Sequence, residues 1–381
     1  MKLIHLSDLH IGKRVLEYSF YEDQAYALGQ ILDIIRAESP DAVLIAGDVY
    51  DKSIPSQEAV ELFDDFTVKL AALETPVFII SGNHDSAERL SFLSRLIDLS
   101  GVHFSPVYDG DVKPYRLNDE YGVVNIYMLP FVKPATVRRF FDGENIETYT
   151  DAVKACVKRM NVNAGERNVL VAHQFVTGAE KSESEDISVG GVDNVDKSAF
   201  DGFNYVALGH LHRPQNVGSE RIRYCGTPLK YSFSEVNDQK SVTVVNIDGV
   251  GNASVKTVPI TPLREMRVIR GKYNDVMLKK FYEGTTLNSD YVKITLLDED
   301  DVVNAAANLK TVYKNLMRLE YDNARTKKTA ELSSAVEPEK KTPLELFEEL
   351  YKTQQNRELS DAQRDYLNGI IEKIWGKNEA D

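Results

Sequence analysis

The chain has 381 residues, of which 43% are hydrophobic and 27% are charged, and its formal net charge is −14. This composition is typical of a globular protein with two or three domains, and no apolar run reaches the roughly 18 residues that a membrane span needs. The negative charge argues against a protein that holds nucleic acid through its overall field, although bound cations could supply positive charge at one site.

The cysteine content and the first residues bear on the compartment. Only Cys156 and Cys225 are present, at no metal-like spacing, so a reducing environment fits and a disulfide scaffold does not. The first ten residues, "MKLIHLSDLH", lack the layout of a signal peptide. We therefore expect a cytoplasmic protein without a membrane anchor.

The first part of the chain alternates apolar strand-like runs with segments of helical periodicity. Strands are predicted at "KLIHLS", "AVLIAGD" and "PVFIISGNHD", and helices at Asp23–Glu38, Glu58–Leu73 and Ser86–Leu99. Further strands are predicted at "VVNIYMLP", "NVLVAHQF", "FNYVALGH" and "SVTVVNID". This alternation indicates an α/β domain with a largely parallel sheet, and we expect it to span residues 1–262.

The pattern changes after the proline turn at Pro262. Residues 263–322 predict a small α+β domain, with strands at "REMRVIRG" and "DYVKITLLD" and a helix from about Val302 to Leu316. Residues 323–341 are charged and poor in large apolar residues, which is typical of a linker. Residues 342–381 hold two amphipathic helices, "PLELFEELYKTQQ" and "SDAQRDYLNGIIEKIW", which are too short to bury both apolar faces against each other.

Five polar clusters stand where predicted strands end. They are "SDLH", "GDVYD", "GNHD", "AHQ" and "GHLH", and they contain Asp8, His10, Asp48, Asn83, His84, His173, His210 and His212. Ligands of open α/β sheets lie at the carboxyl ends of strands, and residues two apart in a strand face the same side. We therefore expect the five clusters to converge on one site.

The residue types of these clusters predict a metal centre. Carboxylate, imidazole and amide oxygen without thiolate suit Mn²⁺, with Fe²⁺ or Zn²⁺ as alternatives. Even seven ligands from these eight side chains are too many for one ion and enough for two if one carboxylate bridges. Two ions about 3.5–4 Å apart are the usual clamp for hydrolysis of phosphate esters. Asp51 and Asp85 are interpreted as caps or partners of ligands, and His5 and His103 as packing or surface residues.

At these clusters the sequence resembles the calcineurin-like metallophosphoesterases, whose pattern is D-x-H, G-D, G-N-H, H and G-H-x-H. "GDVYDKSIPS", "SVGGVDNVDKSAFDGFNYVALGHLHRPQ" and "RYCGTPLKYSFSEVNDQKSVTVV" further resemble the bacterial SbcD nuclease family, and the likeness covers nearly the whole chain. The resemblance implies a four-layer α/β/β/α sandwich, a small α+β capping domain that positions DNA, and a C-terminal helix pair that docks on the coiled-coil base of an SbcC-type ATPase.

The resemblance also implies a role for each site residue. One ion would be held by Asp8, His10, Asp48 and His212, and the other by Asp48, Asn83, His173 and His210, with Asp48 bridging. His84 would be the catalytic residue, which donates a proton to the leaving oxygen or stabilises the developing charge. The archaeal and eukaryotic branch has a histidine where this chain has Asp51, so a supporting role is expected for that residue.

The activity implied is that of a nuclease with two Mn²⁺ ions (Fe²⁺, Zn²⁺ or Mg²⁺ as alternatives). It would act as a 3′-to-5′ exonuclease on double-stranded DNA and an endonuclease on single strands and hairpins, for DNA repair. ATP would act through the SbcC partner in a complex of two nuclease and two ATPase subunits, in which the nuclease is a homodimer. Two alternatives remain: a phosphoesterase for small nucleotides or phosphoproteins, and an inactive adaptor of the ATPase. "GDVYDKS" and "GNHDS" lack the Arg and Glu typical of protein phosphatases, and the intact ligand set argues against an adaptor.

Overall fold

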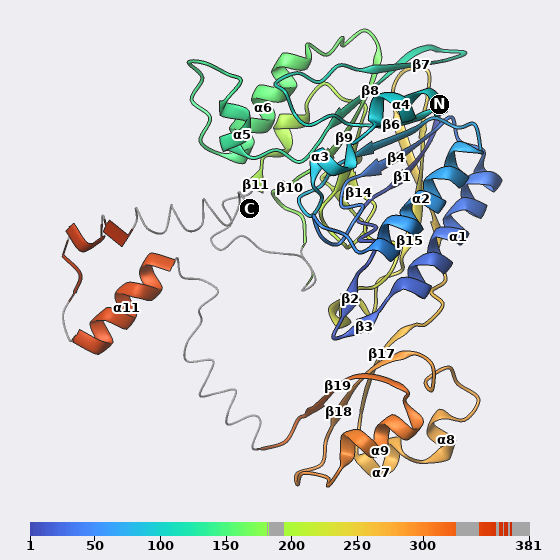
Figure 1. The fold of residues 1–381 in the computed structure, drawn as a ribbon, viewed down its shortest axis with the longest axis vertical. Helices are drawn as coiled ribbons and strands as arrows, with labels where there is room; N and C mark the ends of the chain where they lie inside the picture. Colours follow the sequence, from blue (N-terminus) through green and yellow to red (C-terminus); the bar gives the residue numbers. More distant parts are fainter. Residues whose placement is uncertain are drawn as a thin grey trace. The chain divides into compact units, whose positions relative to one another are not determined.

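A computed structural model describes residues 1–180, 182, 194–324, 343–355, 358–360, 362–364 and 366–367 (Figure 1). The described residues up to Tyr321 form one compact unit, and those from Asp322 onward belong to a second. Within the described ranges, no helix has both the length and the hydropathy that crossing a bilayer would require.

A first six-stranded sheet carries the N-terminal strand at its centre. Its order is β16-β15-β1-β4-β5-β6; β1, β4, β5 and β6 run parallel, whereas β15 and β16 pair antiparallel. Every residue of β4 is buried, as is typical of a parallel strand that is covered on both faces. The bounds are β1 Lys2–Leu6, β4 Ala42–Ala46, β5 Val77–Ile80, β6 Val102–Phe104, β15 Ser241–Ile247 and β16 Ala253–Pro259.

A second six-stranded sheet has the order β13-β14-β12-β9-β8-β7. Its four central strands run parallel, and β7 and β13 pair antiparallel at the two edges. The bounds are β7 Tyr115–Asp119, β8 Gly122–Leu129, β9 Arg167–His173, β12 Tyr205–Gly209, β13 Gln215–Val217 and β14 Ser219–Tyr224. The sequence pattern predicted strands of one largely parallel sheet, and the structure divides them between two.

The two sheets pack face to face and helices cover both outer faces (Figure 1). The inner layer contains Leu44 and Phe78 of the first sheet with Val171 and Ala207 of the second. The outer face of the first sheet packs against α1 and α2, and that of the second against α5 and α6. These helices are α1 Tyr21–Glu38, α2 Gln57–Ala71, α5 Pro134–Arg138 and α6 Tyr149–Met160. The α/β/β/α sandwich expected from the family resemblance is therefore confirmed.

Local sequence signals explain where these helices begin. Ser56 caps α2 by accepting a hydrogen bond from the backbone N–H of Ala59, and Thr148 and Asp151 form a capping box at the start of α6. On α1 the buried side chains recur at helical spacing toward the first sheet, at Ala27, Leu28, Ile31, Leu32 and Ile35.

The helix predicted over Ser86–Leu99 is wrong. The segment forms three short pieces, α3 Ala87–Leu90, α4 Ser94–Ile97 and the 3₁₀ turn η1 Asp98–Ser100, with Leu93 at a left-handed φ of 59° between the first two. Its apolar side chains are mostly in solvent: Phe92 is 72% exposed and Leu99 is 86% exposed. A helix of this length depends on burying its apolar face, so the spacing of apolar residues alone was not sufficient to form a continuous helix.

Short elements complete the region around the sheet ends. The hairpin pairs β2 Arg14–Val15 with β3 Tyr18–Ser19, and β10 Phe175–Val176 pairs in parallel with β11 Asn194–Val195. Two 3₁₀ turns, η2 Lys197–Phe200 and η3 Phe233–Glu235, lie in the connections near the second sheet. The turn η3 carries Glu235, whose carboxylate lies 3.9 Å from Nδ1 of His212.

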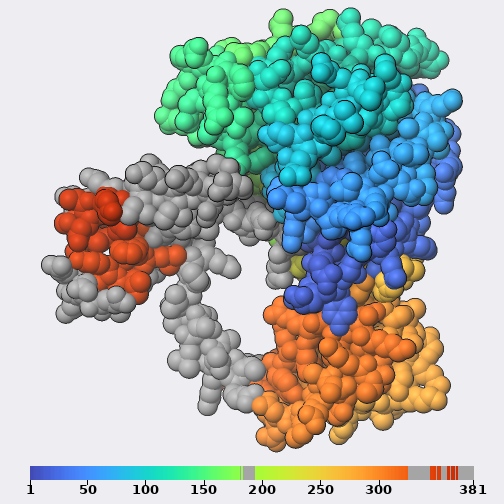
Figure 2. Space-filling view, viewed as in Figure 1, coloured from blue at the N-terminus to red at the C-terminus, as the bar shows by residue number. Residues whose placement is uncertain are grey.

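The small domain after Pro262 is built on three parallel strands in the order β17-β18-β19 (orange in Figures 1 and 2). Its elements are β17 Met266–Gly271, α7 Tyr273–Val276, α8 Lys279–Tyr282, β18 Tyr291–Leu296, α9 Ala305–Val312 and β19 Asn315–Tyr321. The two predicted strands are present, but the helix ends at Val312, and Leu316 belongs to a strand that was not predicted. A short apolar run fits the residue spacing of a helix as well as that of a buried strand, which explains this error.

Of the C-terminal segment, the structure describes α11 Pro343–Gln355, which matches the first predicted helix. Residues 362–364 and 366–367 are helical and fall within the second predicted helix. Ser360, at the start of that prediction, is not helical; the other residues of the prediction, and residues 325–341 of the predicted linker, lie outside the described residues.

Candidate metal centre

The eight candidate side chains follow the carboxyl ends of five neighbouring strands. Asp8 and His10 follow β1, Asp48 follows β4, and Asn83 and His84 follow β5 of the first sheet. In the second sheet His173 is the last residue of β9, and His210 and His212 follow β12. The structure brings all eight together where these ends of the two sheets meet, and the contacts below define the arrangement.

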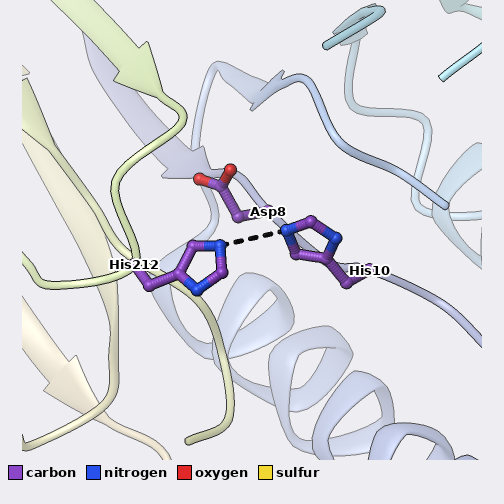
Figure 3. Close-up of side chains that lie close together, drawn as sticks. All are labelled: Asp8, His10 and His212. Carbon is purple, nitrogen blue, oxygen red and sulfur yellow. Dashed lines mark hydrogen bonds between the residues drawn. The ribbon is translucent and has the colours of Figure 1, made fainter. Parts of the chain in front are cut away.

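Asp8, His10 and His212 form one group (Figure 3). Each offers a ligand atom within 4.8 Å of the others, and all three are buried. The Nε2 atoms of His10 and His212 lie 3.1 Å apart and face each other, as the dashed line in Figure 3 marks. Two imidazole nitrogens directed at one point, beside a carboxylate, are the arrangement that a shared cation requires.

Asp48 lies between this group and the rest of the site. Its Oδ2 is 3.7 Å from Nε2 of His10 and 3.3 Å from Nε2 of His173. It belongs to a second group with His10 and His84, and to a third with Asp8 and His173. This central place is the one expected of a bridging carboxylate, a role that stays a prediction.

Asn83 joins the two remaining histidines. Its Oδ1 lies 2.9 Å from Nε2 of His173 and 3.0 Å from Nδ1 of His210. His173 uses its other nitrogen, Nδ1, to donate to the carbonyl of Ala46 at 2.8 Å. That bond would place the lone pair of a neutral His173 on Nε2, so this nitrogen and the amide oxygen would both be available to a metal ion.

The electrostatics of the site fit a bound divalent cation. Burial raises the pKa of Asp8 to about 7, whereas at Asp48 the neighbouring histidines outweigh burial and hold the pKa well below its usual range. Burial lowers the pKa of His10 to about 4 and that of His210 to about 3, so both rings are neutral, as a metal ligand must be. At His173 the Asp48 carboxylate outweighs burial and raises the pKa to about 9. The two buried carboxylates, the neutral rings of His10 and His210 and the Asn83 amide oxygen are donors suited to divalent cations, whereas His173 would have to give up its second ring proton to bind one.

The backbone of the site is held in unusual conformations. Four of the eleven non-glycine residues with positive φ in the described part of the chain belong to it: Asp8 at 51°, His10 at 44°, Asp48 at 48° and His210 at 107°. Such conformations cost about 1–3 kcal/mol each and cluster at functional sites. The concentration of such residues here indicates that the positions of the side chains matter more at this site than the local stability of the backbone.

Gly82 is required by the close approach of the two loops of the first sheet. A Cβ at this position would lie 2.1 Å from Oδ1 of Asp48. At the junction of the sheets, a Cβ at Gly209 would lie 1.9 Å from the carbonyl oxygen of Ala46. The glycines of "SGNH" and "LGHLH" therefore allow the ligand loops to pack in contact.

His84 lies at the edge of the cluster and is half-buried. Its backbone N–H donates to Oδ1 of Asp48 at 2.9 Å, its Nδ1 is 3.0 Å from the carbonyl oxygen of Asp51, and its ring centroid is 4.9 Å from that of His10. It also belongs to a group with ligand spacing. The catalytic role without ligation expected for His84 therefore stays a prediction.

Asp85 and Asp51 support the ligand loops. Asp85 accepts backbone hydrogen bonds from Gly82, Val49 and Tyr50 at 2.9–3.1 Å, which ties the loop after β5 to the loop after β4. Asp51 lies 2.7 Å from the Lys13 ammonium and 3.6 Å from Nδ1 of His10. These contacts suit the supporting roles expected for both carboxylates.

Two further polar residues hold the D-x-H loop and were not predicted. Gln24 of α1 donates to the carbonyl of His10 at 2.7 Å and accepts from the N–H of Gly12 at 3.0 Å, and the Tyr231 hydroxyl donates to the carbonyl of Leu9 at 2.8 Å. The available signal was Gln24 itself, a polar residue that lies, like Asp23, at the start of the mainly apolar buried face of α1.

The two histidines outside the motifs lie away from the cluster. His5 is fully buried, with Nδ1 2.9 Å from the Tyr205 hydroxyl, and burial lowers its pKa to about 3. His103 contacts Asp98 and stacks on Phe78. Both are packing residues, as expected.

Comparison with known proteins gives matches over nearly the whole chain. The profile of the calcineurin-like phosphoesterase family matches residues 1–214, and a profile described as the type 5 capsule protein repressor C-terminal domain matches residues 262–355. A curated relative, the D subunit of the nuclease SbcCD from Staphylococcus epidermidis, is 32% identical over 381 residues, which is 98% of this chain and 99% of the relative.

Among solved structures, the chain is similar to a dimetal phosphatase from Danio rerio, with 14% identity, a TM-score of 0.39 and coverage of 69% of this chain and 99% of that one. A protein of Thermus thermophilus is 11% identical with a TM-score of 0.40, covering 68% of this chain and 99% of that one.

Proposed function

This chain belongs to the calcineurin-like phosphoesterases and, within them, to the SbcD family of nuclease subunits, and we propose that it hydrolyses DNA phosphodiesters in an SbcCD-type repair complex. The observation that supports this activity best is the convergence of Asp8, Asp48, Asn83 and four imidazoles on one point between the strand ends of two sheets.

The proposed division of the ligands between two ions is the one that the family resemblance implies, and the proximity of Asp8, His10 and His212 supports its first half. Asp8, His10, Asp48 and His212 would hold one ion, and Asp48, Asn83, His173 and His210 the other. Two such ions would lower the pKa of an attacking water and stabilise the charge on the phosphate. The residues keep their places through the backbone bonds described above, so little reorganisation is needed at the moment of reaction.

His84 is the proposed proton donor. The contact of its Nδ1 with the carbonyl of Asp51 fixes the ring, so a protonated His84 would present Nε2–H as the second donor. From the edge of the cluster it would protonate the leaving oxygen of the DNA strand or stabilise the charge that develops there.

Manganese is the proposed physiological ion, with Fe²⁺, Zn²⁺ and Mg²⁺ as alternatives. The mixture of imidazole with carboxylate and amide oxygen is typical of Mn²⁺, Fe²⁺ or Zn²⁺ sites, whereas a site for Mg²⁺ usually consists of oxygen alone.

Partners are needed to explain DNA binding by a chain with a net charge of −14. The cations and an SbcC-type ATPase would supply the positive field that DNA requires. The described helix α11 keeps Phe347 and Leu350 exposed at 42% and 53%, and this supports docking of the C-terminal segment on the coiled-coil base of the ATPase. Two nuclease and two ATPase subunits, with a nuclease homodimer, form the proposed assembly.

Each proposed domain has one task. Residues 1–262 would cleave, residues 263–322 would position DNA, residues 323–341 would link, and residues 342–381 would bind the ATPase. Double-stranded ends would be degraded from 3′ to 5′, and single strands and hairpins would be cut internally, with ATP acting through the partner.

The test is a nuclease assay of the purified chain with and without its ATPase, in Mn²⁺, Mg²⁺, Zn²⁺ or chelator. We expect the chain alone to cut circular single-stranded DNA in Mn²⁺ and to lose that activity in chelator. Hydrolysis of a small chromogenic phosphodiester without any cutting of DNA would favour a small-molecule phosphoesterase. Inactivity on both substrates in every metal would favour the adaptor alternative.

A further inference from the structure

A buried ion pair lies directly behind His212. Glu235 is 0% exposed and Lys240 is 4% exposed. The Lys240 ammonium donates to Oε2 of Glu235 at 2.5 Å and to the backbone carbonyl of His212 at 2.8 Å. Burying two charges costs several kcal/mol per ion before their attraction is counted, so an apolar pair would serve stability at least as well. The pair therefore calls for an explanation in terms of its neighbour.

The carboxylate faces the side of the imidazole that points away from the cluster. Oε1 of Glu235 lies 3.9 Å from Nδ1 of His212, whereas Nε2 of the same ring points to Nε2 of His10 at 3.1 Å. The two nitrogens of His212 are thus divided between the buried carboxylate and the candidate metal position.

We propose that Glu235, fixed by Lys240, is the positioning residue of His212: the charge of its carboxylate, 3.9 Å from Nδ1, holds the proton of the neutral ring on Nδ1 and thereby leaves the Nε2 lone pair for the metal. This inference rests on the proposed two-metal site and adds to it the residue pair that sets the orientation of one ligand.

Two physical arguments support this role. A histidine that binds a metal usually donates its other N–H to a carboxylate or carbonyl, which fixes the ring and makes it a stronger ligand. His173 already follows this rule through the carbonyl of Ala46 at 2.8 Å, and Glu235 would favour the same tautomer of His212 through its charge, over the longer distance of 3.9 Å. Lys240 binds both the carboxylate and the backbone of His212, so the three groups form one rigid unit.

The connection between β14 and β15, which carries Glu235 and Lys240, offers a matched control. Lys230 pairs with Glu265 at 2.8 Å and also donates to the carbonyl of Val236 at 2.8 Å, so this second ion pair anchors the loop without facing the candidate ligands. If the substitutions lowered Mn²⁺ affinity only by loosening this connection, Glu265→Gln should lower it as much as Glu235→Gln.

The experiment uses the full-length chain freed of metal and titrated with Mn²⁺ by calorimetry. We compare wild type, Glu235→Gln, Glu265→Gln and the double variant Glu235→Gln/Lys240→Met, which removes both buried charges together if the single variant does not fold. Long-range ¹H–¹⁵N spectra of the Zn²⁺-loaded proteins report which nitrogen of His212 carries the proton.

We expect wild type and Glu265→Gln to bind two Mn²⁺ ions, with His212 protonated on Nδ1. In Glu235→Gln and the double variant, one of the two sites should lose about 10–100-fold in affinity and the Nδ1 proton signal should shift or disappear. Two sites of wild-type affinity in the folded double variant, or an equal loss in Glu265→Gln, would refute the positioning role and leave the proposed function standing. Failure of wild type to bind Mn²⁺ would refute both.

Discussion

The Nε2 atoms of His10 and His212 lie 3.1 Å apart although the residues are 202 positions apart in the chain. His10 follows the central strand β1 of the first sheet, and His212 follows β12 of the second. The contact therefore exists only when the two sheets pack with these strand ends together, and it makes the site a property of the whole sandwich.

Replacing His84 by alanine should stop cleavage and leave metal binding near normal. The side chain lies at the edge of the cluster and its removal leaves all seven proposed ligands in place. Loss of a positioned proton donor typically costs 10²–10⁴-fold in rate, so we expect a fall of about that size in DNA cleavage. Cleavage rate and bound Mn²⁺ should be measured on the same preparation. A parallel loss of metal would show that His84 is a ligand.

Replacing Gly82 by alanine should displace the backbone of the loops that carry the proposed ligands. The added Cβ would lie 2.1 Å from Oδ1 and 2.5 Å from the backbone nitrogen of Asp48, so one of the two loops must move. We expect at least a tenfold loss of Mn²⁺ affinity and a loss of about 1–3 kcal/mol in the free energy of unfolding.

Gly29→Ala is the matched control for that substitution. Gly29 lies within α1, and a Cβ there would meet nothing within 4 Å. The change should raise the free energy of unfolding by about 0.4–1 kcal/mol without altering metal binding. Metal affinity in Gly82→Ala equal to that in Gly29→Ala would mean that the loops tolerate the displacement.

Deleting the chain after Pro338 should separate cleavage from partner binding. The truncated chain keeps the eight site residues and should retain cutting of single-stranded DNA in Mn²⁺, but it should no longer co-purify with the SbcC-type ATPase. Phe347→Glu in the full chain should weaken co-purification in the same direction, whereas Lys352→Ala, at a residue paired with Glu358, should not. Intact binding of the truncated chain would assign the ATPase interface to another part of the protein.

The ion pair between Arg167 and Asp119 should contribute stability that disappears in acid. Oδ2 of Asp119 accepts from Nη1 of Arg167 at 2.9 Å, and this bond holds the pKa of the carboxyl well below its usual range. A carboxyl whose pKa is lowered by folding stabilises the protein above its unfolded pKa, about 3.9, and loses that contribution as the pH falls toward the folded value.

The measurement compares urea unfolding of wild type and Asp119→Asn across pH. We expect the variant to be less stable than wild type at pH 7, with a difference that shrinks steadily below about pH 4. A difference that does not change with pH would mean that the lost stability comes from packing rather than from charge.

The motifs located the candidate site, while the division into two sheets needed the family resemblance. "GDVYD" and "GHLH" each follow an apolar run, and that is sufficient to place Asp48 and His212 at strand ends. Apolar periodicity does not say which strands are neighbours, so the pattern alone predicted a single largely parallel sheet. The comparisons confirm the family, and the structure confirms the four layers.

The supporting residues could not be predicted from the sequence, for a different reason. Glu235 and Lys240 act on His212 across more than twenty positions, and no local pattern distinguishes a buried charge pair from a solvated one. The helix predicted over Ser86–Leu99 failed because its apolar residues face solvent, which depends on what the rest of the fold covers.

Anomalous scattering from crystals soaked in manganese tests the central claim most directly. We predict two peaks about 3.5–4 Å apart, with Asp48 in contact with both, His10 and His212 at one, and His173 and His210 at the other. Absence of peaks among these side chains, or a single peak at saturating Mn²⁺, would contradict the two-metal account.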